Sequence, residues 1–260
     1  HCTTEYTGSS MNTPIDISEA SGVRYLHFGS DWVQGAMRLR KPNALELGYT
    51  REMMAGLLFR EARWPARVLL IGLGAGSMAK FVHHHLPQAS VTVVEIAPEV
   101  HAVARQYFRL PDEDERFEVH IGDGAEFVRT DPRQWDLIAV DGFDRHARAG
   151  ALASLPFYTA CRARLAPEGI LSVNLFGQLR GFKTQLQRLR SAFNGRVLSL
   201  PECDSGNVVA LASTPGGQSF DLANLKLRAA DLKAVTGLDL LPTLRRLEKS
   251  GACPDGTARL

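Results

Sequence analysis

A glycine-rich turn directly after the first long apolar run constrains this chain more than any other feature. The run Arg67-Val-Leu-Leu-Ile71 is followed by Gly72, Gly74 and Gly76, and apolar residues at helical spacing begin at Met78. This order predicts a buried strand, a tight turn and the start of a helix. Glycine lets the backbone bend sharply and approach a ligand, because no Cβ lies in the way. We therefore expect the three glycines to form a ligand-binding loop.

A second apolar run, Val91-Thr-Val-Val-Glu-Ile96, brings a carboxylate to the end of the next strand. Glu95 follows the glycines by roughly 20 residues, a spacing at which a carboxylate accepts hydrogen bonds from ribose hydroxyls. The glycine spacing G-x-G-x-G differs from the dinucleotide pattern G-x-G-x-x-G and is similar to the first motif of S-adenosylmethionine-dependent enzymes. These features favour a nucleoside-containing ligand over two alternatives, a nicotinamide cofactor and a glycine turn that binds nothing.

The composition is that of an ordinary globular protein and excludes several classes of partner. With 260 residues, 45% hydrophobic and 22% charged, the chain can bury one substantial core and a small appended element. A net charge of +2 is too small to argue for a nucleic-acid or membrane surface, and we expect neither partner. No apolar run reaches the ~18 residues of a membrane span. The four cysteines show neither a C-x-x-C pair nor metal-ligand spacing. We expect free thiols, no metal site and a cytoplasmic protein.

The pattern of apolar residues divides the chain into two parts. Residues 1–60 contain two expected strands, 22–28 and 32–39, around a turn, followed by a helix over 49–60. Residues 61–260 alternate strands and helices and form the nucleoside-binding catalytic part. The expected strands are 68–71, 91–96, 117–121, 137–141 and 170–174, and the expected helices are 77–86, 98–108, 123–129 and 155–165.

This alternation predicts an α/β fold with a parallel sheet, helices on both of its faces, and ligand bound at the carboxyl ends of the strands. Two further strands, 196–200 and 207–212, are joined by a segment too short for a parallel crossover, so this pair should be antiparallel. The result is a Rossmann-like methyltransferase fold, with a seven-stranded mostly parallel sheet preceded by a small N-terminal β element. From residue 218 onward the chain should be helical, with Leu240, Leu241, Leu244 and Leu247 as its apolar stripe.

Three aspartates follow the ends of expected strands. Asp123, after the third strand, is placed to bind an adenine amino group or to cap the next helix, and the two roles can coexist. Asp141 ends the fourth strand and Asp144 follows it in a loop. Such a pair suits a reaction in which one carboxylate takes the proton of an amine and the other binds a cation. The alternative for Asp144 is a solvated turn.

These motifs together resemble the spermidine synthase (polyamine aminopropyltransferase) family, which has the class I S-adenosylmethionine-dependent methyltransferase fold. The resemblance extends over roughly residues 20 to 215. It rests on Ile71-Gly-Leu-Gly-Ala-Gly76, Val94-Glu-Ile96, Gly122-Asp-Gly124, Asp136-Leu-Ile-Ala-Val-Asp-Gly-Phe-Asp144, Phe157-Tyr158 and the leading hairpin with Val33-Gln34.

The resemblance implies aminopropyl transfer from decarboxylated S-adenosylmethionine to a diamine such as putrescine, with methylthioadenosine as product and no tightly bound cofactor. On the donor side, Gln34 would contact the nucleoside and thioether, Glu95 the ribose, and Asp123 with Gly124 the adenine. The family also implies a homodimer or homotetramer and a small-molecule amine as the partner.

On the acceptor side, the resemblance makes Asp141 the amine-activating base, while Asp144 and Tyr49 would hold the acceptor. The chain departs from the family at Ala75, where an aspartate normally binds the donor's amino group, and in a basic loop with Arg145 and Arg148. These departures mark a divergent member and leave two alternatives open. One is an S-adenosylmethionine-dependent methyltransferase or other alkyl transferase, and the other is a non-catalytic nucleoside-binding paralogue.

Overall fold

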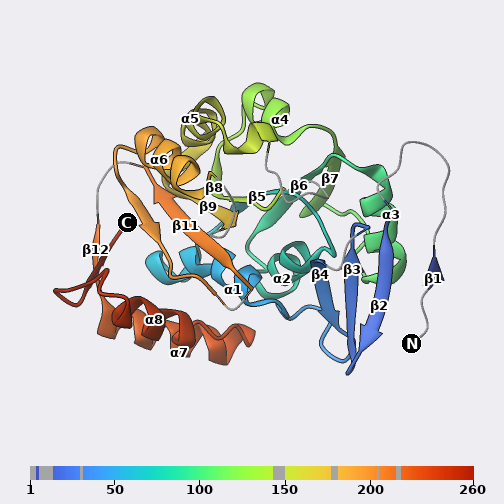
Figure 1. Cartoon of the computed structure of the whole chain (residues 1–260), viewed down its shortest axis with the longest axis horizontal. Helices are drawn as coiled ribbons and strands as arrows, with labels where there is room; N and C mark the ends of the chain where they lie inside the picture. The colour runs from blue at the N-terminus through green and yellow to red at the C-terminus, as the bar shows by residue number, and fades with distance from the viewer. Residues whose placement is uncertain are drawn as a thin grey trace.

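A seven-stranded sheet forms the centre of the molecule (Figure 1). The computed structural model describes residues 4–5, 14–29, 32–142, 150–176, 181–203, 205–214 and 218–260. Across the sheet the strands follow the order β10 (Val197–Ser199), β11 (Asn207–Ser213), β9 (Leu165–Phe176), β8 (Trp135–Val140), β5 (Arg67–Ile71), β6 (Ser90–Glu95) and β7 (Phe117–Ile121).

The strand directions confirm the expected mostly parallel sheet. The five strands from β9 to β7 pair in parallel with their neighbours, whereas β11 is antiparallel to both β9 and β10. The expected antiparallel pair is therefore confirmed, and β11 is the one reversed strand of the seven. The order changes direction at β5, since the chain moves outward from it to β6 and β7 and then returns to β8 on its other side.

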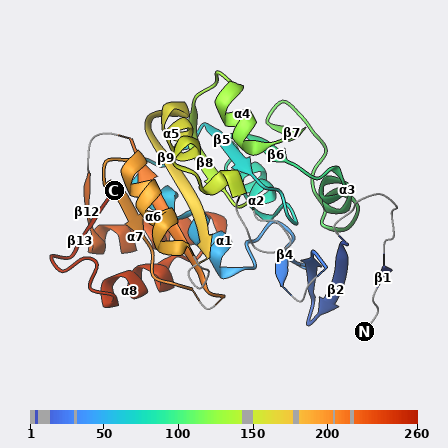
Figure 2. The ribbon, with the colours of Figure 1, turned by 45° about the horizontal axis from the view of Figure 1, so that its top comes forward.

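Helices cover both faces of this sheet (Figure 2). One face packs against α4 (Gly124–Thr130), α5 (Leu155–Arg164) and α6 (Phe182–Ala192), and the other against α1 (Gly48–Met53), α2 (Ser77–His85) and α3 (Pro98–Tyr107). Successive side chains of a strand point to opposite faces of the sheet, which explains the two layers. In β5, Leu69 and Ile71 pack against α4, α5 and α6, whereas Val68 and Leu70 pack on the opposite face. Because both faces are covered, the central strands are continuous apolar runs. Helix α6 was not expected from the sequence.

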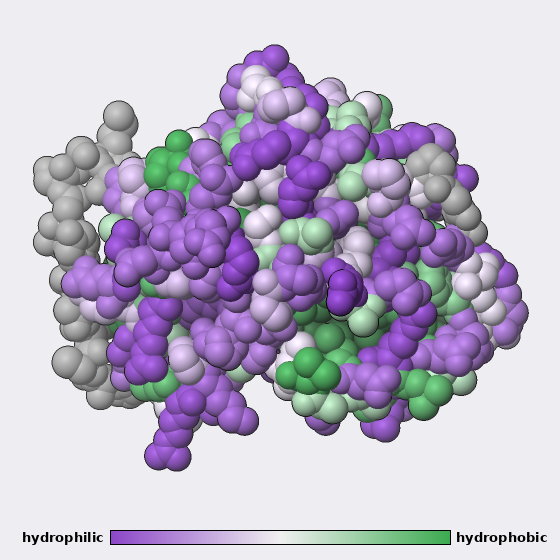
Figure 3. All heavy atoms as spheres, turned by 180° about the vertical axis from the view of Figure 1, so that it is seen from behind, coloured by the Kyte–Doolittle hydropathy of each residue, from purple (hydrophilic) through white to green (hydrophobic). Residues whose placement is uncertain are grey.

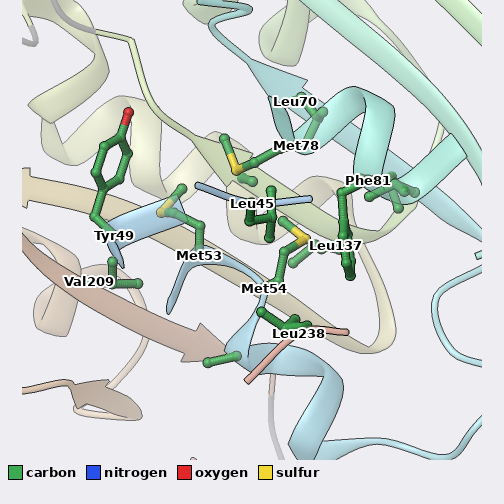
Figure 4. Close-up of a cluster of buried hydrophobic side chains, with 14 of the residues drawn as sticks. Leu45, Tyr49, Met53, Met54, Leu70, Met78, Phe81, Leu137, Val209 and Leu238 are labelled. Carbon is green, nitrogen blue, oxygen red and sulfur yellow. The ribbon is translucent and has the colours of Figure 1, made fainter. Parts of the chain in front are cut away.

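Helix α1 is shorter than expected. The single helix predicted over 49–60 is instead α1 followed by a 3₁₀ turn, Ala55–Phe59, and Gly56, a poor helix former, lies inside that turn. Met53 and Met54 are fully buried among leucine, phenylalanine and methionine side chains beneath the sheet (Figure 4). At the edge of this cluster the ring of Tyr49 extends away from the two methionines and carries its hydroxyl out of the apolar layer.

The N-terminal element is a four-stranded antiparallel sheet and not the two-stranded hairpin that was expected. Its strands are β1 (Thr4–Glu5), β2 (Asp16–Ala20), β3 (Val23–His27) and β4 (Val33–Arg38), in that order. The expected hairpin corresponds to β3 and β4. Arg24 on β3 joins this sheet to the main domain, because its guanidinium donates to the Tyr107 carbonyl at the end of α3, 2.5 Å away.

The C-terminal segment is helical as expected but contains an additional small sheet. Helix α7 (Leu222–Thr236) packs against the core through its buried residues Leu222, Leu225 and Ala229. Helix α8 (Leu241–Lys249) does so through Leu244 and Leu247, with Leu240 buried just before its start. Strands β12 (Ser219–Asp221) and β13 (Thr257–Arg259) pair beside them. In the part of the chain described here, no helix has the length and apolar character to span a membrane. From behind, the surface is mostly hydrophilic, with hydrophobic residues gathered at its lower edge (Figure 3).

Candidate active site

The carboxyl ends of β5, β6, β7 and β8 surround a cavity of about 310 Å³ at the point where the strand order changes direction. Ligands of open α/β sheets bind at this position. Most of the residues that the sequence singled out line this one cavity: Gln34, Tyr49, Gly72, Gly74, Glu95, Asp123, Gly124 and Asp141. Residues far apart in the chain, such as Tyr49 and Asp141 at a separation of 92 positions, are thus brought into a single site.

The glycines of the loop after β5 have different roles. Gly72 has φ of +95°, and a Cβ there would collide with the backbone carbonyl of Asp141. At Gly74 a Cβ would lie 3.0 Å from the Gln34 carbonyl oxygen, so the loop passes close beneath β4. Gly76 does not line the cavity. It adopts φ of +70° at the N-cap of α2 and packs against Leu110, so its role in the structure is to start the helix.

Glu95 binds the glycine loop with one oxygen and its own strand end with the other. Oε2 accepts from the Leu73 N–H at 2.8 Å, and Oε1 accepts from the Ala97 N–H at 2.9 Å. Burial raises the pKa of this carboxyl, which is 7% exposed, while the backbone donors act in the opposite direction. Since each carboxylate oxygen has a second lone pair, Glu95 retains the capacity to accept from ligand hydroxyls.

Asp123 has the capping role that the sequence left open beside ligand binding. Its Oδ1 accepts from the Glu126 N–H at 2.9 Å, which satisfies the first turn of α4. The side chain is exposed and lines the cavity, so its other oxygen is available to a ligand. Gly124 follows directly, and a Cβ there would collide with Ile71 at the end of β5.

Asp141 lines the cavity and is held there by two hydrogen bonds. The Tyr49 hydroxyl donates to its Oδ2 at 3.1 Å, and the Asn174 amide donates to its Oδ1 at 2.8 Å. Burial raises the pKa of Asp141 to about 6, although both hydrogen bonds favour the ionised form. A carboxylate with such a pKa is ionised at neutral pH and takes up protons more readily than an ordinary aspartate. Burial raises the pKa of Tyr49 well above its usual value, so the phenol remains a donor.

Two asparagines at this site were missed by the sequence reasoning. Asn174 ends the expected fifth strand, and a polar residue at that position is itself a signal, because ligand-binding groups gather at strand carboxyl ends. Asn207 donates to the Asn174 amide oxygen at 2.9 Å. It lies at the start of β11, and since this strand is reversed, its amino end lies at the same edge of the sheet as the other strands' carboxyl ends.

Of the positions at which the chain departs from the family that it resembles, the structure describes only Ala75. Ala75 is 2% exposed and packs so closely on Gly35 of β4 that a Cβ at position 35 would collide with it. It is not among the residues that line the cavity. Asp144, Arg145 and Arg148 lie outside the described residues.

The charged groups that line the cavity among the described residues are all acidic. Among the described lining residues, Glu95, Asp123 and Asp141 carry carboxylates, and there is no lysine, arginine or histidine. Three carboxylates in a half-enclosed space create a negative potential that attracts cationic ligands. Elsewhere, the described residues contain no group of three histidine, cysteine, aspartate or glutamate side chains arranged to hold a metal ion.

Comparison with known proteins gives results that agree with this geometry. The sequence model of the spermine/spermidine synthase domain matches residues 46–197. A polyamine aminopropyltransferase of Neisseria meningitidis is 42% identical over 238 residues, which cover 91% of this chain and 89% of the relative. The structure of a spermidine synthase in complex with the transition state analogue AdoDATO superposes with a TM-score of 0.65 and 27% identity, over 81% of this chain and 73% of that one. An eEF1A lysine and N-terminal methyltransferase of Bos taurus is 31% identical, but over only 50% of this chain and 20% of its own length.

Proposed function

Since the chain belongs to the spermine/spermidine synthase family, we propose that it transfers an aminopropyl group from decarboxylated S-adenosylmethionine to a diamine such as putrescine. The observation that carries this proposal is Asp141, which faces the cavity beside the glycine loop and is held by Tyr49 and Asn174. The acidic lining supports it further, because the sulfonium donor and the amine acceptor are both cations.

In the proposed reaction, the donor binds with its ribose against Glu95 and its adenine beside Asp123 and Gly124. The acceptor amine lies next to Asp141 and loses a proton to that carboxylate. The free amine then attacks the carbon next to the sulfonium, so that a C–N bond forms while the C–S bond breaks. The electron pair of the broken bond remains on sulfur, and neutral methylthioadenosine leaves. The protein contributes orientation and proton removal.

Methyl transfer from S-adenosylmethionine is less well supported. The methyltransferase relative matches half of this chain, whereas the aminopropyltransferase relative matches nearly all of it.

We also propose that the enzyme has no resident cofactor, works in the cytoplasm and forms a homo-oligomer. The co-substrate is bound and released in each turnover, with no resident cofactor. The three described cysteines, Cys161, Cys203 and Cys253, are free thiols, which suits a reducing cytoplasm. The assembly is a homodimer or homotetramer. Light scattering coupled to size exclusion measures the assembly, and a monomer at all concentrations would overturn that part.

Calorimetry and a transfer assay test the proposed reaction. The purified chain is titrated with decarboxylated S-adenosylmethionine, S-adenosylmethionine and methylthioadenosine, and spermidine formation from putrescine is followed by chromatography. The proposal expects the decarboxylated donor to bind more tightly than its carboxylated form, because the cavity already carries three negative side chains. Tighter binding of the carboxylated form, with methyl transfer and no spermidine, would support the alternative reaction.

A further inference from the structure

A row of polar side chains leads from Asp141 into the reversed strand. The Asn174 amide donates to Asp141 at 2.8 Å, the Asn207 amide donates to the Asn174 carbonyl oxygen at 2.9 Å, and the Ser205 hydroxyl donates to the Asn207 carbonyl oxygen at 2.6 Å. The thiol of Cys203 lies 3.2 Å from the Ser205 hydroxyl. Asn174 and Asn207 are 4% and 7% exposed, so neither amide can replace these partners with bulk water.

The ionised state of Asp141 fixes the direction of every hydrogen bond in this row. A carboxylate only accepts, so Asn174 must turn its NH₂ group toward Asp141 and its oxygen toward Asn207. Asn207 must then donate to Asn174 and accept from Ser205. The Ser205 hydroxyl has given its one hydrogen, so it accepts from the Cys203 thiol. All the donors therefore point toward the carboxylate.

We infer that Asn207, acting through Asn174, is a positioning residue of the active site that keeps the Asp141 carboxylate ionised and oriented toward the acceptor amine. This inference rests on the proposed function only for the role of Asp141 as base. The row is not a proton wire, because an amide does not exchange its proton readily at neutral pH. Its effect is electrostatic, since hydrogen bonds donated to a charged form stabilise that form.

No cation among the described residues provides this stabilisation instead. The titratable groups around Asp141 are Tyr49 on α1, which donates to its other oxygen, Glu95 and Asp123 at the ends of β6 and β7, and Cys203 at the far end of the row. Asp144 lies outside the described residues. Burial opposes ionisation of Asp141, and the amide and phenol donors favour it.

The far end of the row also opens onto a second cavity. Cys203 and Ser205 line a space of about 280 Å³ together with Arg246 on α8. Ser205 is exposed, so a variant at this residue changes the row from its outer end without disturbing the core. This makes Ser205→Ala a mild variant and Asn207→Leu and Asn207→Asp the strong ones.

The two strong variants should affect the orientation of the Asn174 amide in different ways. Asn207→Leu removes the donor that holds the Asn174 oxygen, so the Asn174 amide loses its fixed orientation. Asn207→Asp places a second acceptor there, which makes Asn174 turn its NH₂ group away from Asp141 and present its oxygen. That arrangement is compatible only with a protonated Asp141. Ser213→Ala, at the buried opposite end of β11, is the matched control for loss of a polar group from the same strand.

The experiment measures the Asp141 pKa directly by carboxyl ¹³C NMR of aspartate-labelled protein, with Asp141→Asn for assignment. The acid limb of kcat/KM for transfer to putrescine is measured in parallel. We expect the Asp141 pKa to rise by about one unit in Asn207→Leu and by more in Asn207→Asp. Ser205→Ala should shift it less in the same direction, and Ser213→Ala not at all. The acid limb should follow the NMR value, with turnover recovering well above it.

Two outcomes separate this inference from the proposed function. If the Asp141 pKa is the same in wild type, Asn207→Asp and Ser205→Ala, all folded by circular dichroism, the inference is overturned. If the pKa moves but the acid limb does not, the row acts as inferred and Asp141 is not the base of the reaction. If Asn207→Leu and Asn207→Asp fail to fold, Ser205→Ala still tests the inference. An unshifted Asp141 pKa in that variant would contradict an effect of the row on Asp141.

Discussion

The Tyr49 hydroxyl donates a hydrogen bond to Oδ2 of Asp141 across 3.1 Å, although the two residues lie 92 positions apart in the chain. Tyr49 comes from α1, which packs beneath β9 and β11, and Asp141 follows the end of β8. The ring lies at the edge of the apolar core that also contains Met53 (Figure 4). The position of the proposed base therefore depends on how the helix before the glycine loop packs against the sheet.

Removing the Tyr49 hydroxyl should shift the pH dependence of activity. In Tyr49→Phe the Asp141 carboxylate loses one of its two donors, so its pKa should rise above about 6 by about one unit. The acid limb of kcat/KM should move to higher pH by the same amount. Tyr25→Phe, a matched change in the N-terminal sheet, is the control. An unmoved acid limb would mean that Tyr49 has no influence on the base.

Replacing the carboxylate itself should separate turnover from binding. Asp141→Asn keeps the shape of the side chain but cannot take the amine's proton, so kcat should fall on the order of 10²–10⁴-fold. Because the proposed reaction places the acceptor amine next to Asp141, calorimetric affinity for methylthioadenosine should change little. Comparable turnover in wild type and variant would show that another group is the base.

The pH dependence of kcat/KM in the wild-type protein can also be predicted. Since burial raises the Asp141 pKa to about 6, the base is ionised above that pH, and kcat/KM should fall about tenfold per unit below it.

The inner strands β5 and β8 of the central sheet were predictable because they are almost entirely buried and consist mostly of consecutive apolar residues. The strand β2 was not, since Asp16-Ile-Ser-Glu-Ala20 is largely polar and half-exposed. Helix α6 was not predicted for a similar reason, because only two of its residues, Leu189 and Ala192, are buried. Local pattern cannot reveal an element whose stability comes from its neighbours.

The candidate site was predictable in its parts and not in its connections. Glycines and acidic residues at strand ends mark a ligand site on a parallel sheet, and most of those named line one cavity. The link from Asn174 to Asn207 depends on β11 inserting in reverse next to β9, which no local pattern specifies. The exclusion of Gly76 and Ala75 from the cavity likewise depends on how tightly β4 and the chain near Leu110 pack on the loop.

Glu95 should contribute to both donor binding and stability. In Glu95→Ala a ligand's ribose loses its acceptor, which should weaken methylthioadenosine binding by ~2–4 kcal/mol. The Leu73 and Ala97 N–H groups also lose their acceptor, so the free energy of unfolding should fall by about 1–3 kcal/mol. Calorimetry and urea denaturation measure the two effects. Glu115→Ala, at an exposed position, controls for the loss of one negative charge, and equal affinities in the two variants would refute the ribose assignment.

Gly72 should tolerate no side chain, for reasons of both φ and space. Gly72→Ala would bring a Cβ against the carbonyl of Asp141, a residue whose own N–H donates to the Ile71 carbonyl at 2.8 Å and so holds the backbone at this point. Gly22→Ala, with φ of +76° but open space around it, isolates the conformational cost of about 1–2 kcal/mol. We expect Gly72→Ala to cost about 3–5 kcal/mol in urea denaturation and to weaken donor binding. Equal costs would show that the loop adjusts.

Lys80 on α2 gives a pH dependence of stability that is separate from the active site. The side chain is 1% exposed, and its ammonium donates to the Phe108 carbonyl at 2.6 Å. Burial, with Arg109 nearby, lowers the Lys80 pKa from 10.5 to about 7. Between these two values the unfolded chain binds the proton more strongly than the folded one, so the free energy of unfolding should rise with pH through this window; below it, Lys80 should add no pH dependence.

Replacement of Lys80 should remove that contribution. In Lys80→Met the side chain cannot titrate. The free energy of unfolding of the wild type should therefore increase relative to that of the variant between about pH 7 and 10.5, by at most ~1.4 kcal/mol per pH unit. Near pH 7 and below, the two proteins should differ by a constant amount, because the wild type then carries a buried charge and the variant lacks a donor for the Phe108 carbonyl. Urea denaturation at half-unit intervals measures the difference, and Lys249→Met, an exposed change in α8, controls for net charge. A difference between wild type and Lys80→Met that stays constant from pH 7 to 10 would mean that Lys80 keeps its proton throughout, held as a cation by the Phe108 carbonyl despite its burial.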